Sequence, residues 1–237
     1  MNRRARRPVN WRARRPVNRR LVAALLFAFL MPAPSRAQDS ESRLTLEILM
    51  EQMAKTSGVR AHFRERKEIS LLSAPIETHG VLYFVPPDRL ARHTLEPGRA
   101  VLVIDGDSVR FFDASVGEPV DLSSDPIARQ FAQNFAVLFN GDLASLRERY
   151  RVSFRSDGDH WELALDPRSA AVREFVRDIT LRGRGATLLE MVWRETDGDQ
   201  TTTRFDEVET NRAFSDEELD RAFPSGKPWR DPGSPVP

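Results

Sequence analysis

Short runs of alternating apolar and polar residues recur along residues 59–208, and turn residues separate them. Successive side chains of a β-strand point to opposite faces, so a period of two predicts strands with one buried face. The runs are AHFRERKEI, GVLYFV, RLARHTLE, AVLVID and SVRFFD, followed later by YRVSFRS, HWELALD, VRDITLRG, ATLLEMVW and QTTTRFDEV. Because short turns link most of them, the sequence predicts one antiparallel sheet of about ten strands.

The tripeptide Asp-Gly-Asp lies between predicted strands three times, at residues 105–107, 157–159 and 197–199. A calcium loop would need an acidic ligand about eleven positions after its first aspartate. The chain has Val116, Arg168 and Val208 at those positions. Asp-Gly readily adopts the positive φ angles of tight hairpins, so the three motifs are interpreted as turns.

An amphipathic helix is predicted over residues 43–57, with Ser40 or Ser42 as its candidate N-cap and Gly58 at its end. Its apolar residues recur at helical spacing: Leu46, Leu49, Met50 and Met53.

A helical insert is predicted over residues 126–150, between the two groups of strands. It begins after Asp125, breaks at Asn140 and Gly141, and resumes after Asp142 as a second N-cap. The capping-box pair Ser215 and Glu218 predicts a last helical turn. The expected fold class is therefore α+β, an antiparallel sheet whose apolar face is covered by the N-terminal helix and the insert.

The first 37 residues have the pattern of a secretory signal. An arginine-rich region precedes the apolar run LVAALLFAFLM, and small residues flank Arg36, so cleavage is expected after Ala37. The run is too short to span a membrane. A periplasmic protein is expected, with a signal over 1–37, one domain over 38–224 and a Pro/Gly-rich tail over 225–237.

The charge of the predicted mature domain argues against nucleic acid as a partner. The leader holds ten arginines and no acid, and removing it leaves 26 basic and 35 acidic residues, a formal charge of −9. Nucleic acid rewards clustered Lys and Arg.

Catalytic and metal motifs are not evident in the sequence. The chain has no Cys, and its four histidines form no HExxH or i, i+4 pair. No GxSxG motif or phosphate-binding glycine loop is present. We expect a monomer that is not an enzyme and that has no cofactor and no metal.

Large apolar residues gather on the predicted strands and on the helical insert. The candidate residues are Leu82, Phe84, Leu90, Phe131, Phe135, Phe139, Trp161, Leu163, Leu181, Leu189 and Met191. One interpretation is an ordinary packed core. The other is a hydrophobic cavity under a curved sheet, because Met, Trp and Phe make adaptable walls for acyl chains.

The segment GVLYFVPPDRLARHTLEP, followed by VLVIDGDSVRFFD, resembles the periplasmic lipoprotein carriers of the LolA type. AHFRERKEI is similar to that family's first strand, and residues 188–226 are similar to its closing hairpin and final Phe-x-x-Pro-x-Gly. The similarity covers about residues 43–226. It implies an incomplete antiparallel β-barrel with its convex side to solvent, whose helices close a cavity for lipid acyl chains.

The resemblance also implies roles for particular residues. Leu90 falls where the family has an apolar side chain at the cavity mouth, three residues after a proline that Pro87 matches. In the better-known carriers an arginine before that proline holds the lid. Here Pro86 takes its place and has no N–H donor, so Arg89 and Arg92 are the nearby candidates for the same role.

Two functions follow as expectations. The first is a carrier that moves lipid or lipoprotein acyl chains toward the outer membrane, with an inner-membrane donor and an outer-membrane acceptor as partner proteins. The second is an envelope binding or sensing module that uses the same sheet to engage a protein. A cavity distinguishes the first, and an exposed apolar patch on a filled core distinguishes the second.

Overall fold

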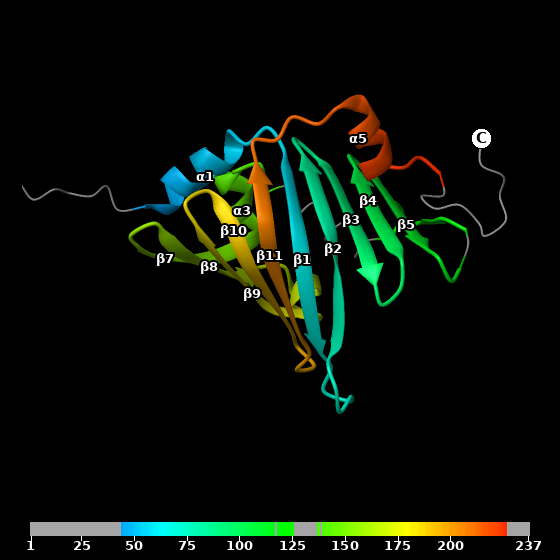
Figure 1. Ribbon diagram of the computed structural model, residues 1–237. Coiled ribbons are helices and arrows are strands. Elements are labelled where there is room, and N and C mark those ends of the chain that lie inside the picture. Colours follow the sequence, from blue (N-terminus) through cyan, green and yellow to red (C-terminus); the bar gives the residue numbers. More distant parts are fainter. Residues whose placement is uncertain (1–43, 117, 126–136, 138, 227–237) are drawn as a thin grey trace, which may run out of the picture. The chain divides into compact units, whose positions relative to one another are not determined.

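The computed structural model describes residues 44–116, 118–125, 137 and 139–226, and an antiparallel sheet of eleven strands organises them (Figure 1). The strands are β1 Val59–Glu68, β2 Ile76–Val85, β3 Arg89–Glu96, β4 Ala100–Asp105, β5 Ser108–Asp113, β6 Val120–Asp121, β7 Tyr150–Asp157, β8 His160–Pro167, β9 Val176–Arg184, β10 Thr187–Glu195 and β11 Gln200–Thr210. The prediction of about ten strands is confirmed. The additional strand, β6, has only two residues and no recognisable alternation.

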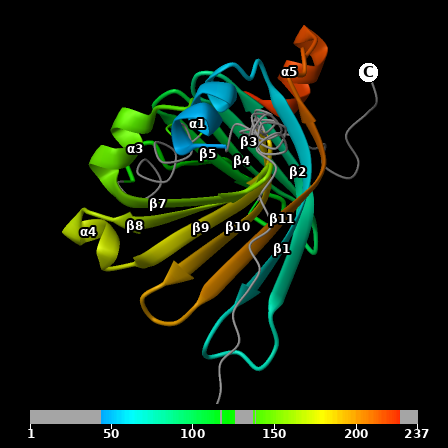
Figure 2. The same ribbon diagram turned by 90° about the vertical axis from the view of Figure 1, so that its left-hand side faces the viewer.

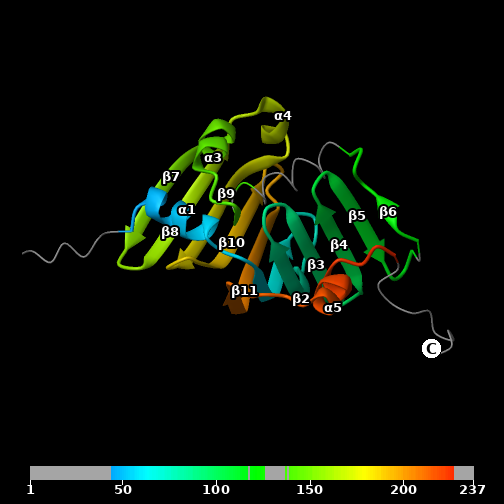
Figure 3. The ribbon, with the colours of Figure 1, turned by 90° about the horizontal axis from the view of Figure 1, so that it is seen from above.

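The sheet order is β6-β5-β4-β3-β2-β1-β11-β10-β9-β8-β7. The first strand therefore pairs with the last one at the centre, while β6 and β7 form two free edges, so the sheet stays open. It bends around the side on which α1 and α3 lie (Figures 2 and 3). We call this side the inner face and the opposite side the outer face. The predicted α+β class with an incomplete barrel is confirmed.

The three Asp-Gly-Asp motifs form the predicted hairpin turns. They join β4 to β5, β7 to β8 and β10 to β11. Their glycines have φ angles of +59° at Gly106, +57° at Gly158 and +98° at Gly198, a region that L-residues rarely adopt.

Helix α1 spans Leu46–Ala54 and begins after Thr45, whose hydroxyl accepts a hydrogen bond of 3.3 Å from the Ile48 amide. The predicted caps Ser40 and Ser42 are wrong, because the residue that supplies the cap must directly precede the first turn. The four apolar residues predicted for one face are all buried.

The remaining helices are short. Helix α3, Leu143–Arg149, starts at the predicted cap Asp142, and α5, Asp216–Ala222, has the predicted capping box of Ser215 and Glu218. The single turn α4, Ala170–Arg173, was not predicted. Residues 126–136 of the predicted insert, the predicted leader and most of the predicted tail lie outside the described residues. In the described part of the chain, no helix is long and apolar enough to cross a membrane.

The outer face of strands β7 to β11 bears a chain of ion pairs, which we call the outer ladder. Arg155 pairs with Glu162, Arg182 contacts Glu162 at 2.9 Å and Glu190 at 2.7 Å, and Arg204 contacts Glu190 at 3.1 Å. The hydrogen bonds from Arg155 and then Arg182 hold the pKa of Glu162 below its ordinary value. The outer face of this half of the sheet is therefore charged and faces solvent, as the resemblance implied.

The outer face of β2 to β5 is instead covered by α5. A second apolar cluster joins Ala222 and Phe223 to four strand residues, Ala91, Val101, Val103 and Phe112. The Arg89 guanidinium lies 4.4 Å from the centre of the Phe223 ring. The C-terminal helix thus holds one half of the sheet between two layers, which the sequence analysis did not foresee.

His93 fastens α5 to the sheet and makes this contact sensitive to pH. Its ring Nε2 lies 2.7 Å from the Ala222 carbonyl oxygen, which fits a neutral imidazole that donates its Nε2–H. Burial lowers the pKa of His93. Below the ordinary value of about 6.5 the unfolded chain binds a proton that the folded chain resists, so stability falls as the pH falls through that range.

We expect urea denaturation of the wild type to show a loss of stability between about pH 7 and pH 5 that His93→Gln reduces. Glutamine retains an amide donor for the Ala222 carbonyl but does not titrate. Equal pH slopes for the two proteins would contradict a role for His93.

A candidate ligand-binding face

The inner face of the sheet is the apolar wall of the candidate site. Six of the predicted residues are buried there in one cluster, namely Leu82, Phe84, Leu90, Trp161, Leu163 and Leu181. Phe139 and Met191 are partly buried and pack against the same cluster. Phe131 and Phe135 lie outside the described residues. The structure therefore brings eight of the predicted residues to one face.

Leu189 is placed differently from its prediction. It is 38% exposed, whereas its neighbour Leu188 is buried in the inner cluster. The register between β9 and β10 shifts between Leu188 and Glu190. A bulge of this kind adds one residue to a strand and breaks the strict alternation of faces, so Leu188 takes the inward position.

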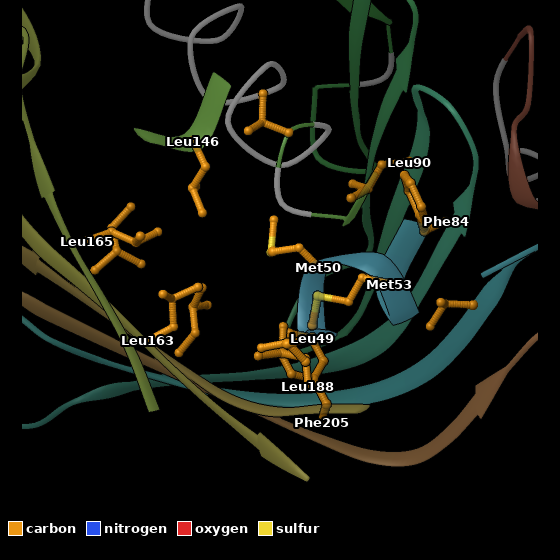
Figure 4. Close-up of a cluster of buried hydrophobic side chains, with 14 of the residues drawn as sticks. Leu49, Met50, Met53, Phe84, Leu90, Leu146, Leu163, Leu165, Leu188 and Phe205 are labelled. Carbon is orange, nitrogen blue, oxygen red and sulfur yellow. The ribbon is translucent and has the colours of Figure 1, made fainter. Parts of the chain in front are cut away.

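The hollow of the inner face is filled by α1. Leu49 and Met50 are at most 1% exposed and belong to the same cluster as the strand residues (Figure 4). Beside Met53 a cavity of about 30 Å³ remains, with Leu82, Phe139, Leu188 and Phe205 among its lining residues. That volume is about the share of one water molecule in the liquid. Among the described residues, an acyl chain can therefore enter this part of the inner face only by displacing α1 side chains.

Helix α1 is attached mainly at its two ends. Near its start, the Ser156 hydroxyl donates a 2.7 Å hydrogen bond to the Leu44 carbonyl, and Arg147 forms an exposed 2.7 Å ion pair with Glu47. Near its end, Gly141 packs so closely that an added Cβ would lie 2.1 Å from the Met50 carbonyl oxygen. Between these points the contacts are apolar and non-directional, so another apolar group can replace them.

The turn between β2 and β3 is joined to the insert. The Asn140 side-chain amide donates a hydrogen bond to the Pro87 carbonyl, and the Phe84 and Phe139 rings lie 4.9 Å apart between centroids. The donor of this hydrogen bond belongs to the insert and the acceptor to the turn. An arginine at the position of Pro86 would instead place the donor on the turn. Leu90 pairs with Phe84 across the two strands beside this junction.

Both arginines suggested as substitutes form contacts with strand residues or with Phe223. Arg89 points to the outer face, 3.4 Å from Asp105. Arg92 lies on the inner face, where it forms a 2.9 Å ion pair with Glu65 and sits 4.2 Å from the centre of the Phe63 ring. Burial lowers the pKa of Arg92, against the attraction of Glu65.

Glu65 is the centre of a polar cluster that the sequence analysis missed. Its carboxylate also accepts a 2.9 Å hydrogen bond from the Thr203 hydroxyl. The signal was a charged residue at an inward position of each of the two strands that flank β2, Glu65 in β1 and Arg92 in β3. The cluster ends the apolar wall, because a partly buried ion pair offers no favourable surface to a hydrocarbon chain.

Three carboxylates at the β10–β11 turn, those of Glu195, Asp197 and Asp199, lie within 4.8 Å of one another. Lys67 pairs with Glu195 at 3.0 Å, and the Ser70 hydroxyl donates a 2.8 Å hydrogen bond to Asp199. These contacts tie the turn to the neighbouring hairpin, which is a sufficient structural role for the group.

Comparisons with known proteins address the family. The model of the family described as "Outer membrane lipoprotein carrier protein LolA-like" matches residues 37–218. The outer-membrane lipoprotein carrier protein of Pseudomonas aeruginosa is 22% identical over 207 residues, which cover 87% of this chain and 97% of that protein. The one from Chromohalobacter salexigens is 26% identical over 135 residues, 57% of this chain and 62% of that protein, less than two thirds of its length.

Among solved structures, a LolA superfamily protein from Nitrosomonas europaea is 13% identical with a TM-score of 0.40, over 73% of this chain and 96% of that one. MucB is 18% identical with a TM-score of 0.45, over 79% and 67%. The family match extends over more than half of the sequence, from the end of the predicted leader into α5. The chain belongs to the LolA-like family of outer membrane lipoprotein carrier proteins.

Proposed function

We propose that the protein is a periplasmic carrier that holds the acyl chains of a lipoprotein or another envelope lipid against the inner face of its sheet. An inner-membrane donor would load it, and an outer-membrane acceptor would take the lipid. The observation that carries this proposal is the cover of the apolar wall. In the described residues it consists of short helical segments rather than of a second sheet, and α1 has its polar contacts near its ends and apolar contacts between them.

The exchange of α1 for a ligand is energetically balanced. Burying the four apolar side chains of α1 contributes about 1.5–3 kcal/mol each, or about 6–12 kcal/mol together. An acyl chain of about fifteen methylene groups contributes about 12 kcal/mol at about 0.8 kcal/mol per group. Because the two sums are similar, a chain can displace the helix and a better acceptor can reverse the exchange. Met50 and Met53 suit this role, since unbranched side chains adapt to different neighbours.

Leu188 and Leu189 provide a matched test of acyl binding. Leu188→Glu places a carboxylate among the cavity-lining residues, whereas Leu189→Glu places the same group on the exposed side of the same strand. We expect Leu188→Glu to weaken uptake of a fluorescent fatty-acid probe at least tenfold, because a buried unpaired charge costs more than about 1.4 kcal/mol. Leu189→Glu is expected to retain wild-type affinity.

Native mass spectrometry of the protein purified from periplasm is the second measurement, and we expect bound lipid. Circular dichroism establishes that each variant is folded, and if Leu188→Glu unfolds, Leu90→Glu at the Pro87 junction replaces it. The absence both of co-purifying lipid and of saturable probe uptake would refute the proposal, as would equal affinity of the two Leu→Glu variants.

A module that engages an envelope protein is the second candidate, because α1 fills the hollow in this structure. Such a module would keep α1 in place at all times. Capture of a protein from envelope extract, with no lipid in the complex and no probe uptake, would favour it over the carrier.

A further inference from the structure

The loop between β1 and β2 exposes apolar side chains at one end of the sheet. Residues 69–76 read Ile-Ser-Leu-Leu-Ser-Ala-Pro-Ile and contain no charge, in a chain where 30% of residues are charged. Leu71 is 94% exposed, Leu72 is 51% exposed and Ile76 is 42% exposed. Figure 1 shows this loop projecting beyond the ends of the neighbouring strands. The uncharged sequence and the exposed apolar side chains therefore occur together at the tip of this loop.

Hydrogen bonds hold the tip in a defined conformation. The Ser70 amide and hydroxyl both donate hydrogen bonds to the Asp199 carboxylate, at 2.9 Å and 2.8 Å. The Leu72 amide donates a 2.9 Å hydrogen bond to the Ile69 carbonyl. The adjacent β10–β11 hairpin thus supports the loop from one side and holds the two leucines at its end, where their apolar surface stays in water.

The charges around the tip exclude an acidic surface as its partner. Lys67 is paired with Glu195 at 3.0 Å, and Arg66 with Glu68 at 3.2 Å. The carboxylates of Asp197 and Asp199 are also nearby, so the surroundings carry a net negative charge. Anionic lipids and acidic proteins attract unpaired basic residues, which the described tip lacks.

The shape of the tip argues for a bilayer rather than for a protein. A stable protein interface buries about 1,200–2,000 Å² in total, far more than three side chains on a narrow hairpin offer. A bilayer surface is deformable and accepts a few apolar side chains between headgroups without a complementary pocket. We propose that Leu71 and Leu72 insert into the interfacial region of a membrane of zwitterionic lipid.

The position of the tip sets how the sheet would be oriented on a membrane. β2 begins at Ile76 beside the tip and ends at Val85 beside the Pro86–Pro87 turn. Its ten residues span about 33 Å, so the junction of Asn140 with Pro87 lies about that far from the tip. A membrane bound at the tip therefore leaves the α1 end of the inner face uncovered.

The test is co-sedimentation of the purified protein with vesicles of phosphatidylcholine and phosphatidylethanolamine. We expect wild-type protein to bind and the double variant Leu71→Glu with Leu72→Glu to lose at least tenfold in partitioning. Leu189→Glu, an exposed leucine away from the tip, is the matched control and is expected to bind like wild type. Adding salt or anionic phosphatidylglycerol is expected not to strengthen binding.

A second measurement uses Leu71→Trp, whose added fluorescence is expected to shift to shorter wavelength with vesicles, beyond any shift of the wild-type protein. The double Glu variant should keep wild-type uptake of the fatty-acid probe in solution, so a failure of this proposal and a failure of acyl binding can be told apart. Undetectable vesicle binding by wild type, equal binding by the double variant, or binding that requires anionic lipid would overturn the membrane contact.

Discussion

Replacing Gly80 by alanine is expected to lower the free energy of unfolding by about 3 kcal/mol or more. Gly80 lies in β2, where a Cβ atom would stand 1.8 Å from the His93 carbonyl oxygen and 2.9 Å from a carbon of the Phe63 ring. The oxygen belongs to the backbone of β3, and the ring is 1% exposed. Neither neighbour can move without breaking strand pairing or core packing at the centre of the sheet.

Urea denaturation, followed by circular dichroism, measures this loss. Gly98→Ala is the matched control, because the space around that glycine is open to 4 Å and its backbone angle is ordinary. We expect the control to unfold close to the wild-type midpoint. A Gly80→Ala midpoint equal to that of Gly98→Ala would show that β3 can shift and that the close approach is not required.

Replacing Gly141 by alanine is expected to destabilise the protein by about 2–4 kcal/mol and to loosen α1. The residue has a φ angle of +67°, which costs an L-residue about 1 kcal/mol. A Cβ there would also lie 2.1 Å from the Met50 carbonyl oxygen and 2.9 Å from the Ala54 Cβ. The steric part of the effect acts on α1 alone, because both neighbours belong to that helix.

Gly158→Ala separates the two causes. Gly158 has nearly the same φ angle, +57°, but an added Cβ would meet no atom within 4 Å. The difference in urea midpoint between the two variants therefore reports the contact with α1. If α1 competes with acyl chains, as proposed, Gly141→Ala should also bind the fatty-acid probe more tightly than Gly158→Ala. Equal stability and equal affinity of the two variants would contradict the role of this contact.

The regular parts of the fold could be predicted because their signals are local. An Asp-Gly pair specifies a backbone angle at one residue, and each of the three predicted turns formed. Alternation helped to identify ten strands, since most strands bury one face more fully than the other. Membership of a carrier family also confirms the prediction that the chain is not an enzyme.

The sequence patterns did not predict features that depend on contacts between residues far apart in the sequence. One extra residue in β10 exchanges the places of Leu188 and Leu189, and alternation cannot reveal a bulge. The cover of α5 over β4 was also missed. The continuous apolar run AVLVID was a usable signal, because a strand buried on both faces loses its alternation.

The candidate site could also be predicted only in part from the sequence. The sequence predicted an amphipathic helix and an apolar sheet face, and both exist. Periodicity identifies which side of an element is apolar, but it does not give the distance between two apolar sides. Whether α1 filled the hollow therefore required the side-chain positions of Leu49, Met50 and Met53.

The outer ladder makes the two sides of the sheet unequal as contact surfaces. Each of its two carboxylates, on Glu162 and Glu190, is shared by two guanidinium groups. A molecule that covered this side would have to dehydrate all five charges, each of which already has a partner of opposite sign. The back of β7 to β11 is therefore a costly surface for another molecule to cover, and the charge-free tip of residues 69–76 is not.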